Sequence, residues 1–386
     1  MNIRNRDQLL DIVAPSPVLA RRREALDLME AALQSVDAKR GTRRAIERLQ
    51  DRHGPLPACT VFAFGKASIP MAEAALECLD VKQGVVLCLE DAHLSPLRVI
   101  RAGHPLPAPD AFERGAEVLQ LAESLESSDC ALCLVSGGGS AMLEAPQPGI
   151  SLAEIQRATR SALQGGADIA TLNEMRQRLS RIKAGGLARA LAPATVYNVV
   201  LSDVPGHPPA LVASGPTFSS EVPDTHCEVA AENAVAREAI VRAAQATGRD
   251  IQVARALLVG EARQAGARFQ WSAQGRSLVA GGETTVTVRG DGLGGRNQEF
   301  VLGALSAWQG GLTVAFGTDG VDGCSLDAGA LVDDYVLQEM QRRGINPGAF
   351  LEQNDSNGFF RELGAAIHTG PTGTNVADLA IHLAPS

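Results

Sequence analysis

A set of glycine-rich turns carries most of the side chains in this sequence that could do chemistry. Each turn lies where an apolar segment ends, and together they supply a lysine, an arginine, carboxylates, hydroxyls and backbone amides. They are Gly65-Lys66, Ser136-Gly137-Gly138-Gly139-Ser140, Gly281-Gly282-Glu283, Gly294-Gly295-Arg296-Asn297, Gly317-Thr318-Asp319-Gly320 and Gly370-Pro371-Thr372-Gly373-Thr374-Asn375. Glycine is retained where a chain turns tightly or lets another group approach its amides. The set predicts a site for a polyanionic small molecule.

The turn with three consecutive glycines is the clearest of these. It follows the apolar run 131–135 and precedes a sequence that favours a helix. Backbone N–H groups presented by such a turn can hold an anion. We therefore expect the phosphates of a nucleotide to be bound by Ser136, Gly137, Gly138, Gly139 and Ser140.

Two cations are candidates for catalysis. Lys66 follows a strand-like run and opens a helix, where the helix dipole disfavours a positive charge unless an anion is bound there. Its alternative interpretation is an ordinary surface lysine. Arg296 lies between two glycines and polar residues, a setting that suits two-point recognition of phosphate or carboxylate. Its alternative interpretation is an ion pair with a carboxylate of the protein.

Three carboxylates are candidates for binding Mg²⁺: Asp203, Glu283 and Asp319. Each follows or borders a predicted strand, and phosphoryl transfer needs a hard cation with oxygen ligands beside the phosphates. The alternatives are a turn cap for either aspartate and a simple turn residue for Glu283. Asp322 and Asp327 are weaker candidates, for which the alternative is a position at the surface.

Asn297, Thr374 and Asn375 complete the predicted cofactor-binding set, although the last two also suit a purely structural turn. His104 is more typical of a packed loop than of a base. Neither the P-loop spacing Gly-x4-Gly-Lys-Ser/Thr nor the dinucleotide spacing Gly-x-Gly-x-x-Gly is present, and no Ser/His/Asp order or zinc spacing stands out. The residues by themselves predict a magnesium-dependent enzyme acting on a nucleotide or a sugar-acid phosphate.

The elements that must position these residues read as α/β. Helices are expected at 7–52, 68–79, 109–125 and 228–246. Strands are expected at 60–64, 84–89, 99–102, 131–135, 198–201, 252–256, 277–280, 284–288, 312–316 and 380–382. Uninterrupted apolar runs alternating with helices indicate a parallel sheet covered on both faces. The run 284–288 looks antiparallel and makes the second sheet mixed. A Pro/Gly/Ser-rich stretch places the boundary between domains 1–218 and 219–386.

Composition narrows the possible partners. The net charge of −9 and the low aromatic content of 4% disfavour a nucleic-acid partner. No segment is apolar over a membrane-spanning length and no signal-type core opens the chain, so we expect a cytoplasmic protein. The seven scattered cysteines are typical of reduced, buried thiols, including Cys130 and Cys133. The expected partner is a small-molecule substrate, and a homo-oligomer is left open.

The motifs, in their order along the chain, resemble the glycerate 2-kinase family, whose members carry a C-terminal MOFRL domain and are often labelled hydroxypyruvate reductase. The resemblance runs from about residue 7 to 385. It rests on Gly65-Lys-Ala-Ser68, Ala102-Gly-His-Pro105, Leu134-Val-Ser-Gly-Gly-Gly-Ser-Ala141, Ser202-Asp-Val-Pro-Gly206, Ala213-Ser-Gly-Pro216, Gly281-Gly-Glu-Thr-Thr-Val286, Gly294-Gly-Arg-Asn-Gln-Glu299, Gly317-Thr-Asp-Gly320 and Thr369-Gly-Pro-Thr-Gly-Thr-Asn375.

The resemblance implies a Rossmann-like N-terminal domain, a second α/β domain of the MOFRL type and an active cleft between them. It implies ATP-dependent phosphorylation of D-glycerate at its 2-hydroxyl to give 2-phosphoglycerate and ADP. Lys66 and Arg296 carry over as essential residues, and Asp203, Glu283, Asn297 and Asp319 as residues of the cleft.

Three positions depart from the family pattern. Leu89-Glu-Asp-Ala-His93 replaces a segment that is usually basic, His207 replaces an aspartate, and Ala184 replaces a glycine. These departures affect the expected substrate range more than the fold. Two other functions stay open: an NAD(P)H-dependent hydroxypyruvate reductase, and a sugar-acid sensor without catalysis.

Overall fold

The chain folds into two compact units, which do not follow the predicted boundary. The computed structural model describes residues 2–104, 106–164, 175, 178–222 and 224–385. One unit, here the central unit, comprises residues 37–231. The other, here the terminal unit, combines residues 1–36 with residues 232–386. The predicted domains 1–218 and 219–386 therefore differ from the units at both ends of the central segment.

The central unit is built on a six-stranded sheet in which every strand is parallel to its neighbours, in the order β3-β2-β1-β4-β5-β6. The strands are β1 (Cys59–Phe64), β2 (Val81–Cys88), β3 (Leu97–Arg101), β4 (Cys130–Ser136), β5 (Thr195–Leu201) and β6 (Thr225–Ala231). The helices are α3 (Ala38–His53), α4 (Ser68–Cys78), α5 (Ala111–Glu123), α6 (Gly139–Met142), α7 (Leu152–Gln164), α9 (Gly186–Leu191) and the 3₁₀ turn η1 (Pro209–Ser214). This confirms the predicted parallel sheet.

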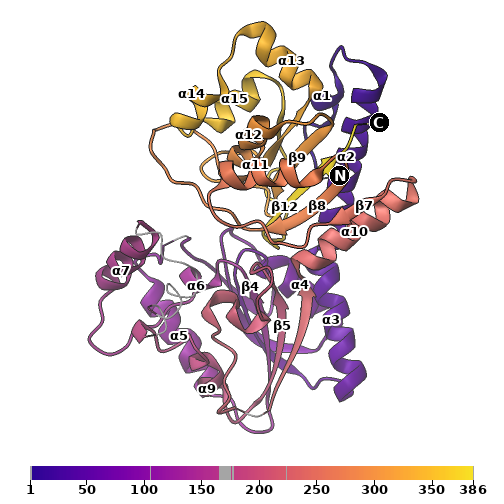
Figure 1. Cartoon of the computed structure of the whole chain (residues 1–386). Helices are drawn as coiled ribbons and strands as arrows, with labels where there is room; N and C mark the ends of the chain where they lie inside the picture. Colours follow the sequence, from indigo (N-terminus) through magenta and orange to yellow (C-terminus); the bar gives the residue numbers. More distant parts are fainter. Residues whose placement is uncertain (1, 105, 165–174, 176–177, 223, 386) are drawn as a thin grey trace. The chain divides into compact units, whose positions relative to one another are not determined.

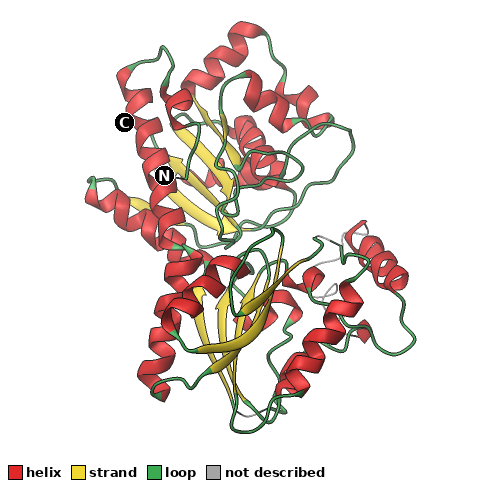
Figure 2. Ribbon diagram, turned by 180° about the vertical axis from the view of Figure 1, so that it is seen from behind, coloured by secondary structure: helices red, strands yellow, loops and turns green. Residues whose placement is uncertain are grey.

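Helices cover both faces of this sheet (Figures 1 and 2). α3 packs against α4 and β6 on one face, while α5 packs against α9 on the other. β1 and β4 lie at the centre and are buried along their whole length. Double coverage explains why both strands read as unbroken apolar runs. Cys130 and Cys133 lie on β4 as buried free thiols, as predicted.

The terminal unit holds a second six-stranded sheet in the order β11-β10-β9-β12-β8-β7. Its strands are β7 (Ile251–Val253), β8 (Ser277–Gly282), β9 (Leu312–Gly317), β10 (Gly329–Asp333), β11 (Ala366–Ile367) and β12 (Asp378–Leu383). Its helices are α1 (Arg6–Leu10), α2 (Ser16–Ser35), α10 (Asn233–Ala246), α11 (Ala262–Ala273), α12 (Arg296–Ala304), η2 (Leu305–Ala307), α13 (Asp334–Arg343), α14 (Pro347–Glu352) and α15 (Ser356–Glu362).

This second sheet is mixed, as predicted, but for a different reason. The run 284–288 is not a strand; within it only Thr285 forms an isolated parallel bridge, to Glu261. The antiparallel pairs are instead β8 with β12, β12 with β9, β9 with β10, and β10 with β11. The segment alternates threonine and valine and so looks like a strand, yet it finds no continuous partner in the sheet.

The units differ from the predicted domains because one of them combines both ends of the chain, whereas each predicted domain is one continuous segment. Helix α2 packs against α10 and the second sheet, and buried Arg22 donates through Nε to Asp333 at 2.7 Å. At the other end, residues 225–231 form β6, which pairs with β5 in the first sheet. The predicted helix at 228–246 thus begins only at Asn233. No helix among the described residues is both long and apolar enough to cross a membrane.

A buried histidine on β12, His382, makes the stability of the fold depend on pH. His382 is 1% exposed, and its Nδ1 lies 2.9 Å from Thr313 Oγ1. The Thr313 hydroxyl donates its proton to Gln270 Oε1, so it accepts from Nδ1–H of a neutral imidazole. Burial, reinforced by the charge of Arg21, lowers the pKa of His382 to about 4.

We expect this histidine to make the fold less stable as the pH falls from 7 to 5. The pKa of His382 is lower in the folded chain than in the unfolded chain. Its contribution to the stability of the fold is therefore present above pH 6.5 and is lost as the pH falls toward 4. Through this histidine, the free energy of unfolding should fall by about 2 kcal/mol between pH 7 and pH 5. Urea unfolding of wild type and His382→Asn at both pH values measures it, and the variant should lose that much less. An equal loss in both proteins would contradict the assignment.

Candidate active site

The carboxyl ends of β1 and β4 form the natural binding position of the central sheet. These two strands are neighbours, and the chain leaves them for opposite edges, β1 toward β2 and β4 toward β5. At such a switch point the connections diverge and leave room for a ligand. Lys66 follows β1, and the turn 137–139 follows β4. Both turns therefore lie at the same edge of the sheet.

Specific contacts join the two turns. The Lys66 N–H donates to the Gly137 carbonyl at 2.8 Å, and the Ala67 N–H donates to Ser136 Oγ at 3.1 Å. Gly65 has φ +120°, and a Cβ atom there would clash with Ser136 Oγ. Ser136 is fully buried. The Ser136 hydroxyl therefore links the two turns by a hydrogen bond, which is a structural role in addition to the predicted cofactor contact.

Lys66 and His104 meet above the middle glycine of the turn. Gly138 has φ +82°, and a Cβ atom added there would lie 3.2 Å from Lys66 Cγ and 3.0 Å from His104 Cδ2. Only glycine leaves room for both side chains and adopts this backbone without strain. His104 is exposed, so it is not the packed loop residue that the sequence suggested. Pro105, its neighbour in the motif, lies outside the described residues.

Asp203 and Ser140 also lie at this edge of the central sheet. Ser136 lies opposite Leu201, the last residue of β5, and Asp203 follows that strand after one residue. Ser140 Oγ lies 2.8 Å from Ser214 Oγ. The central unit thus gathers Lys66, the 136–140 turn, Asp203 and His104 at the carboxyl ends of its strands. A cation beside backbone amides can bind and stabilise a phosphate group.

The departures from the family pattern have visible consequences here. Ala184 has φ +52°, a conformation that glycine adopts more easily, so its replacement of the usual glycine leaves a strained turn. The preceding Lys183 is buried and forms an ion pair with buried Glu144. His207 is exposed, and Leu89 is 37% exposed.

The second group of predicted residues gathers at one edge of the terminal unit. β12 runs antiparallel between β8 and β9, and its first residue, Asp378, lies opposite Gly282 and Gly317. The amino end of β12 therefore meets the carboxyl ends of its neighbours. Glu283 follows β8 directly and Asp319 follows β9 after one residue, so the topology brings the three carboxylates to the same edge.

Arg296, the first residue of α12, is the cation of this cluster. Its Nε and Nη2 atoms donate to the two carboxylate oxygens of Asp378, at 2.5 and 3.0 Å. Its Nη1 lies 2.9 Å from Glu283 Oε1. Burial acts to lower the pKa of Arg296, but Asp378 and Glu283 raise it above its ordinary value. The ion pair that was the alternative interpretation of Arg296 is therefore present, with one guanidinium bridging two carboxylates.

Asn297 and Asp322 extend the hydrogen-bond network around Arg296 and Asp378. The Asn297 side-chain amide donates to Asp378 Oδ1 at 3.0 Å and to Asp322 Oδ1 at 3.2 Å. Asp322 also accepts from the backbone N–H groups of Asn297 and Gln298, at 2.9 and 2.8 Å. Burial raises the pKa of Asp322 to about 7, although those two N–H groups act to lower it. Asp322 thus caps α12 and is buried, which excludes the surface position that was its alternative.

Other predicted residues of the terminal unit have protein partners too. Thr374 is buried and donates to the Val36 carbonyl at 2.6 Å, while Asn375 Oδ1 accepts from the Ala377 N–H. Asp319 Oδ1 accepts from the Val321 N–H at 3.2 Å. Asp327 is buried and pairs with Arg361 at 2.8 Å, which excludes the surface position that was its alternative.

Among the described residues, no group of three or more His, Cys, Asp and Glu side chains is arranged to hold a metal ion. The predicted carboxylates Glu283 and Asp319 lie in the terminal unit, whereas Asp203 lies in the central unit. Oxygen ligands suited to Mg²⁺ are present, but the protein by itself does not build a closed cage. Magnesium commonly keeps substrate phosphates and water as ligands, so an incomplete protein shell fits it.

Sequence reasoning missed Asp378, the residue that holds Arg296. The only available signal was one acidic residue opening the apolar run 379–381, directly after the Thr374-Asn375 turn. An acid at the start of a buried strand needs a buried cation as partner. The sequence does not tell which arginine supplies it.

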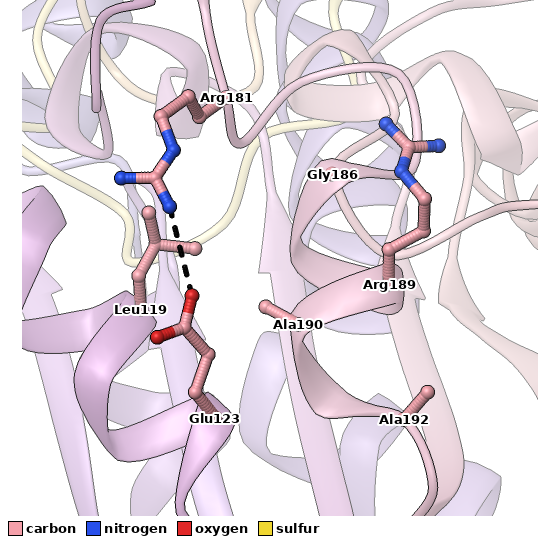
Figure 3. A pocket seen from close by; sticks show the side chains of 7 residues that line it. All are labelled: Leu119, Glu123, Arg181, Gly186, Arg189, Ala190 and Ala192. Carbon is pink, nitrogen blue, oxygen red and sulfur yellow. Dashed lines mark ion pairs between the residues drawn. The ribbon is translucent and has the colours of Figure 1, made fainter. Parts of the chain in front are cut away.

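A separate pocket, of about 360 Å³, lies in the central unit away from these residues (Figure 3). It is lined by Leu119, Glu123, Arg181, Gly186, Arg189, Ala190 and Ala192. Arg181 Nη2 lies 3.6 Å from Glu123 Oε1 across it. None of the residues predicted from the sequence to be functional lines this pocket. Its position between α5 and α9 is on a face of the sheet, not at the carboxyl ends of the strands.

Comparison with known proteins gives one consistent family. Residues 24–247 match the family described as "Domain of unknown function (DUF4147)", and residues 276–378 match the MOFRL family. The chain is 33% identical to the D-glycerate 2-kinase of Thermotoga maritima, covering 93% of this chain and 97% of that protein. It is 32% identical to the glycerate 2-kinase of Pyrococcus horikoshii, covering 84% and 87%. A putative hydroxypyruvate reductase of Agrobacterium vitis is 33% identical, covering 83% and 98%.

The crystal structure of the glycerate kinase from Thermotoga maritima superimposes with a TM-score of 0.84 at 31% identity, covering 94% of this chain and 99% of that one. This agreement confirms the α/β architecture and the resemblance that the motifs suggested. The chain belongs to the glycerate kinase family, in which a DUF4147 domain precedes a MOFRL domain.

Proposed function

We propose that this protein is a glycerate 2-kinase, which transfers the γ-phosphoryl group of ATP to the 2-hydroxyl of D-glycerate. The observation that carries the proposal is Lys66 beside the triple-glycine turn at the switch point of the central sheet. Family membership over nearly the whole chain supports it. In the reaction the hydroxyl oxygen bonds to the γ-phosphorus, the bond to the β,γ-bridging oxygen breaks, and the hydroxyl proton is released.

Each residue has a definite part in this proposal. The amides of the 136–140 turn bind nucleotide phosphates, and Lys66 stabilises the negative charge spread over the transferring group. Arg296 supplies a second cation with fixed orientation. The amide of Asn297 orients Arg296 through the Asp378 carboxylate that both residues contact. Thr374 and Asn375 support the turn beside them.

The carboxylates that would hold magnesium are Asp319 and Glu283 at one edge of the terminal unit, Glu283 once its pairing with Arg296 loosens, and Asp203 is the corresponding candidate of the central unit. When bound, the ion would neutralise negative charge on the phosphates of ATP. Oxygen donors without thiols or imidazoles match the preference of a hard cation. We also propose a cytoplasmic enzyme, in line with its seven free cysteines.

The test is a product-resolved kinase assay on the purified full chain. Protein, Mg·ATP and D-glycerate are combined with enolase and without phosphoglycerate mutase, so that only 2-phosphoglycerate becomes phosphoenolpyruvate. We expect ADP and phosphoenolpyruvate to appear together. Excess chelator should stop ADP formation, which is measured directly because enolase itself needs Mg²⁺. ADP without phosphoenolpyruvate would indicate phosphorylation at another hydroxyl. Full activity in excess chelator would overturn the magnesium role.

The two alternatives are tested in parallel. Hydroxypyruvate with NADH or NADPH should give no fall in nicotinamide absorbance, because the turn after β1 reads Gly65-Lys-Ala-Ser68 and lacks the dinucleotide spacing. Reduction without ADP formation would replace the kinase by the reductase. Tight binding of glycerate with neither activity would favour a sensor.

A further inference from the structure

Asp378 is the buried carboxylate that contacts Arg296. It is 2% exposed and opens β12, the strand that lies between β8 and β9. Its backbone is held as firmly as its side chain. The Asn233 side-chain amide donates to the Asp378 carbonyl at 3.0 Å, and a Cβ atom at Gly281 would clash with Asn233. The carboxylate is therefore presented from a fixed point of the sheet.

Both oxygens of this carboxylate are directed at Arg296. Oδ2 accepts from Nε at 2.5 Å and Oδ1 accepts from Nη2 at 3.0 Å. Oδ1 also accepts from the Asn297 side chain at 3.0 Å. This two-point contact fixes the plane of the guanidinium group, because two parallel N–H bonds allow one orientation only.

The remaining nitrogen of Arg296, Nη1, pairs with a more exposed carboxylate. Nη1 contacts Glu283, whose side chain is 51% exposed, whereas that of Asp378 is 3% exposed. The buried carboxylate of Asp378 and the half-exposed carboxylate of Glu283 therefore bind different nitrogens of the same guanidinium group. A purely structural ion pair would need only the buried half of this arrangement.

We propose that Asp378 is a positioning residue for phosphoryl transfer, which holds Arg296 by Nε and Nη2 so that Nη1 faces an anionic substrate group. The inference rests on the proposed function, since it assigns Arg296 to the reaction. Asp378 touches neither substrate nor nucleotide in this proposal and acts only through Arg296. The anion contacted by Nη1 would be a phosphoryl oxygen of the nucleotide or the carboxylate of the hydroxy acid.

A double-mutant cycle tests this dependence. Wild type, Asp378→Asn, Arg296→Ala and the double variant are compared in the kinase assay. We expect kcat to fall about a hundredfold in Asp378→Asn, as for loss of one preorganised donor, and the double variant to be no slower than Arg296→Ala. Losses that multiply would show that the two residues act independently, which would overturn the proposal.

Chemical rescue gives a readout that a merely structural role would not move. Millimolar guanidinium should restore part of the kcat of Arg296→Ala, because the ion can bind the vacant Asp378 carboxylate. The same ion should not rescue the double variant. Equal rescue in both would contradict positioning by Asp378.

Two controls keep the result interpretable. Thermal unfolding identifies a variant that fails to fold; in that case Asp378→Glu keeps the buried charge but shifts the carboxylate, and full kcat in it would contradict positioning. Wild-type kcat in Arg296→Ala would remove the assigned role of Arg296 and this inference with it. An inactive Arg296→Ala beside a fully active Asp378→Asn would overturn this inference alone and leave the proposed function standing.

Discussion

Lys66→Ala is expected to lower kcat for glycerate phosphorylation by at least about a hundredfold, equivalent to about 3 kcal/mol of transition-state stabilisation. The reason is its place at the switch point, beside the turn that follows β4. The fold should remain intact, because the hydrogen bond from Lys66 to Gly137 uses the backbone N–H, which alanine retains. Steady-state kinetics together with thermal unfolding measure both parts of this expectation.

Lys82→Ala is the matched control on the same sheet. Lys82 lies near the start of β2, at the opposite end of the parallel strands, and its side chain is 55% exposed. Its pairing with Asp129 is long, at 3.7 Å, so its loss should leave both kcat and stability close to wild type. Near-wild-type kinetics in Lys66→Ala would remove the lysine from the mechanism. A similar loss in both variants would point to a general effect of charge.

Arg296→Lys is expected to lose activity to a similar extent, about a hundredfold in kcat, even though the charge is kept. Arg296 uses three nitrogens to contact two carboxylates, Asp378 by Nε and Nη2 and Glu283 by Nη1. A single ammonium group cannot make both contacts in one plane. The measurement is kcat and KM for D-glycerate and for ATP, at constant ionic strength.

Arg361→Lys is the corresponding control in the terminal unit. Arg361 pairs through Nε with Asp327 at 2.8 Å, and its side chain is 55% exposed. The contact uses a single guanidinium nitrogen, so the ammonium group of lysine can replace it. Full activity of Arg296→Lys would show that charge alone suffices at that position, and would also remove the basis for an oriented guanidinium.

The sequence predicted the central sheet well because its strands are buried on both faces. Such strands have no polar alternation, so 60–64 and 131–135 read directly as apolar runs. Where a segment lacked that pattern the prediction was wrong. Residues 284–288 alternate like a strand but form only one bridge, and residues 228–231, read as helix, belong to β6. Strand formation depends on a partner, and a local pattern does not reveal the partner.

The turns that follow strands were predictable for a related reason. Glycine at a strand end indicates a close approach, as at Gly138 between Lys66 and His104. The sequence therefore nominated Lys66 and the 136–140 turn from local signals alone. The family resemblance, carried by the same motifs, then supplied the reaction that the residues by themselves left open.

Only the tertiary structure decided how the charged groups pair and which segments share a core. Asp378 lies 82 residues from Arg296 in sequence, and its role depends on β12 running antiparallel between β8 and β9. Likewise, α2 joins the terminal unit through its packing on α10 and the buried pair of Arg22 with Asp333. Local sequence determined the strands and their glycine turns because backbone conformation and burial act over a few residues. Charge pairing and domain membership were left to the tertiary structure, because both depend on contacts between residues far apart in the chain.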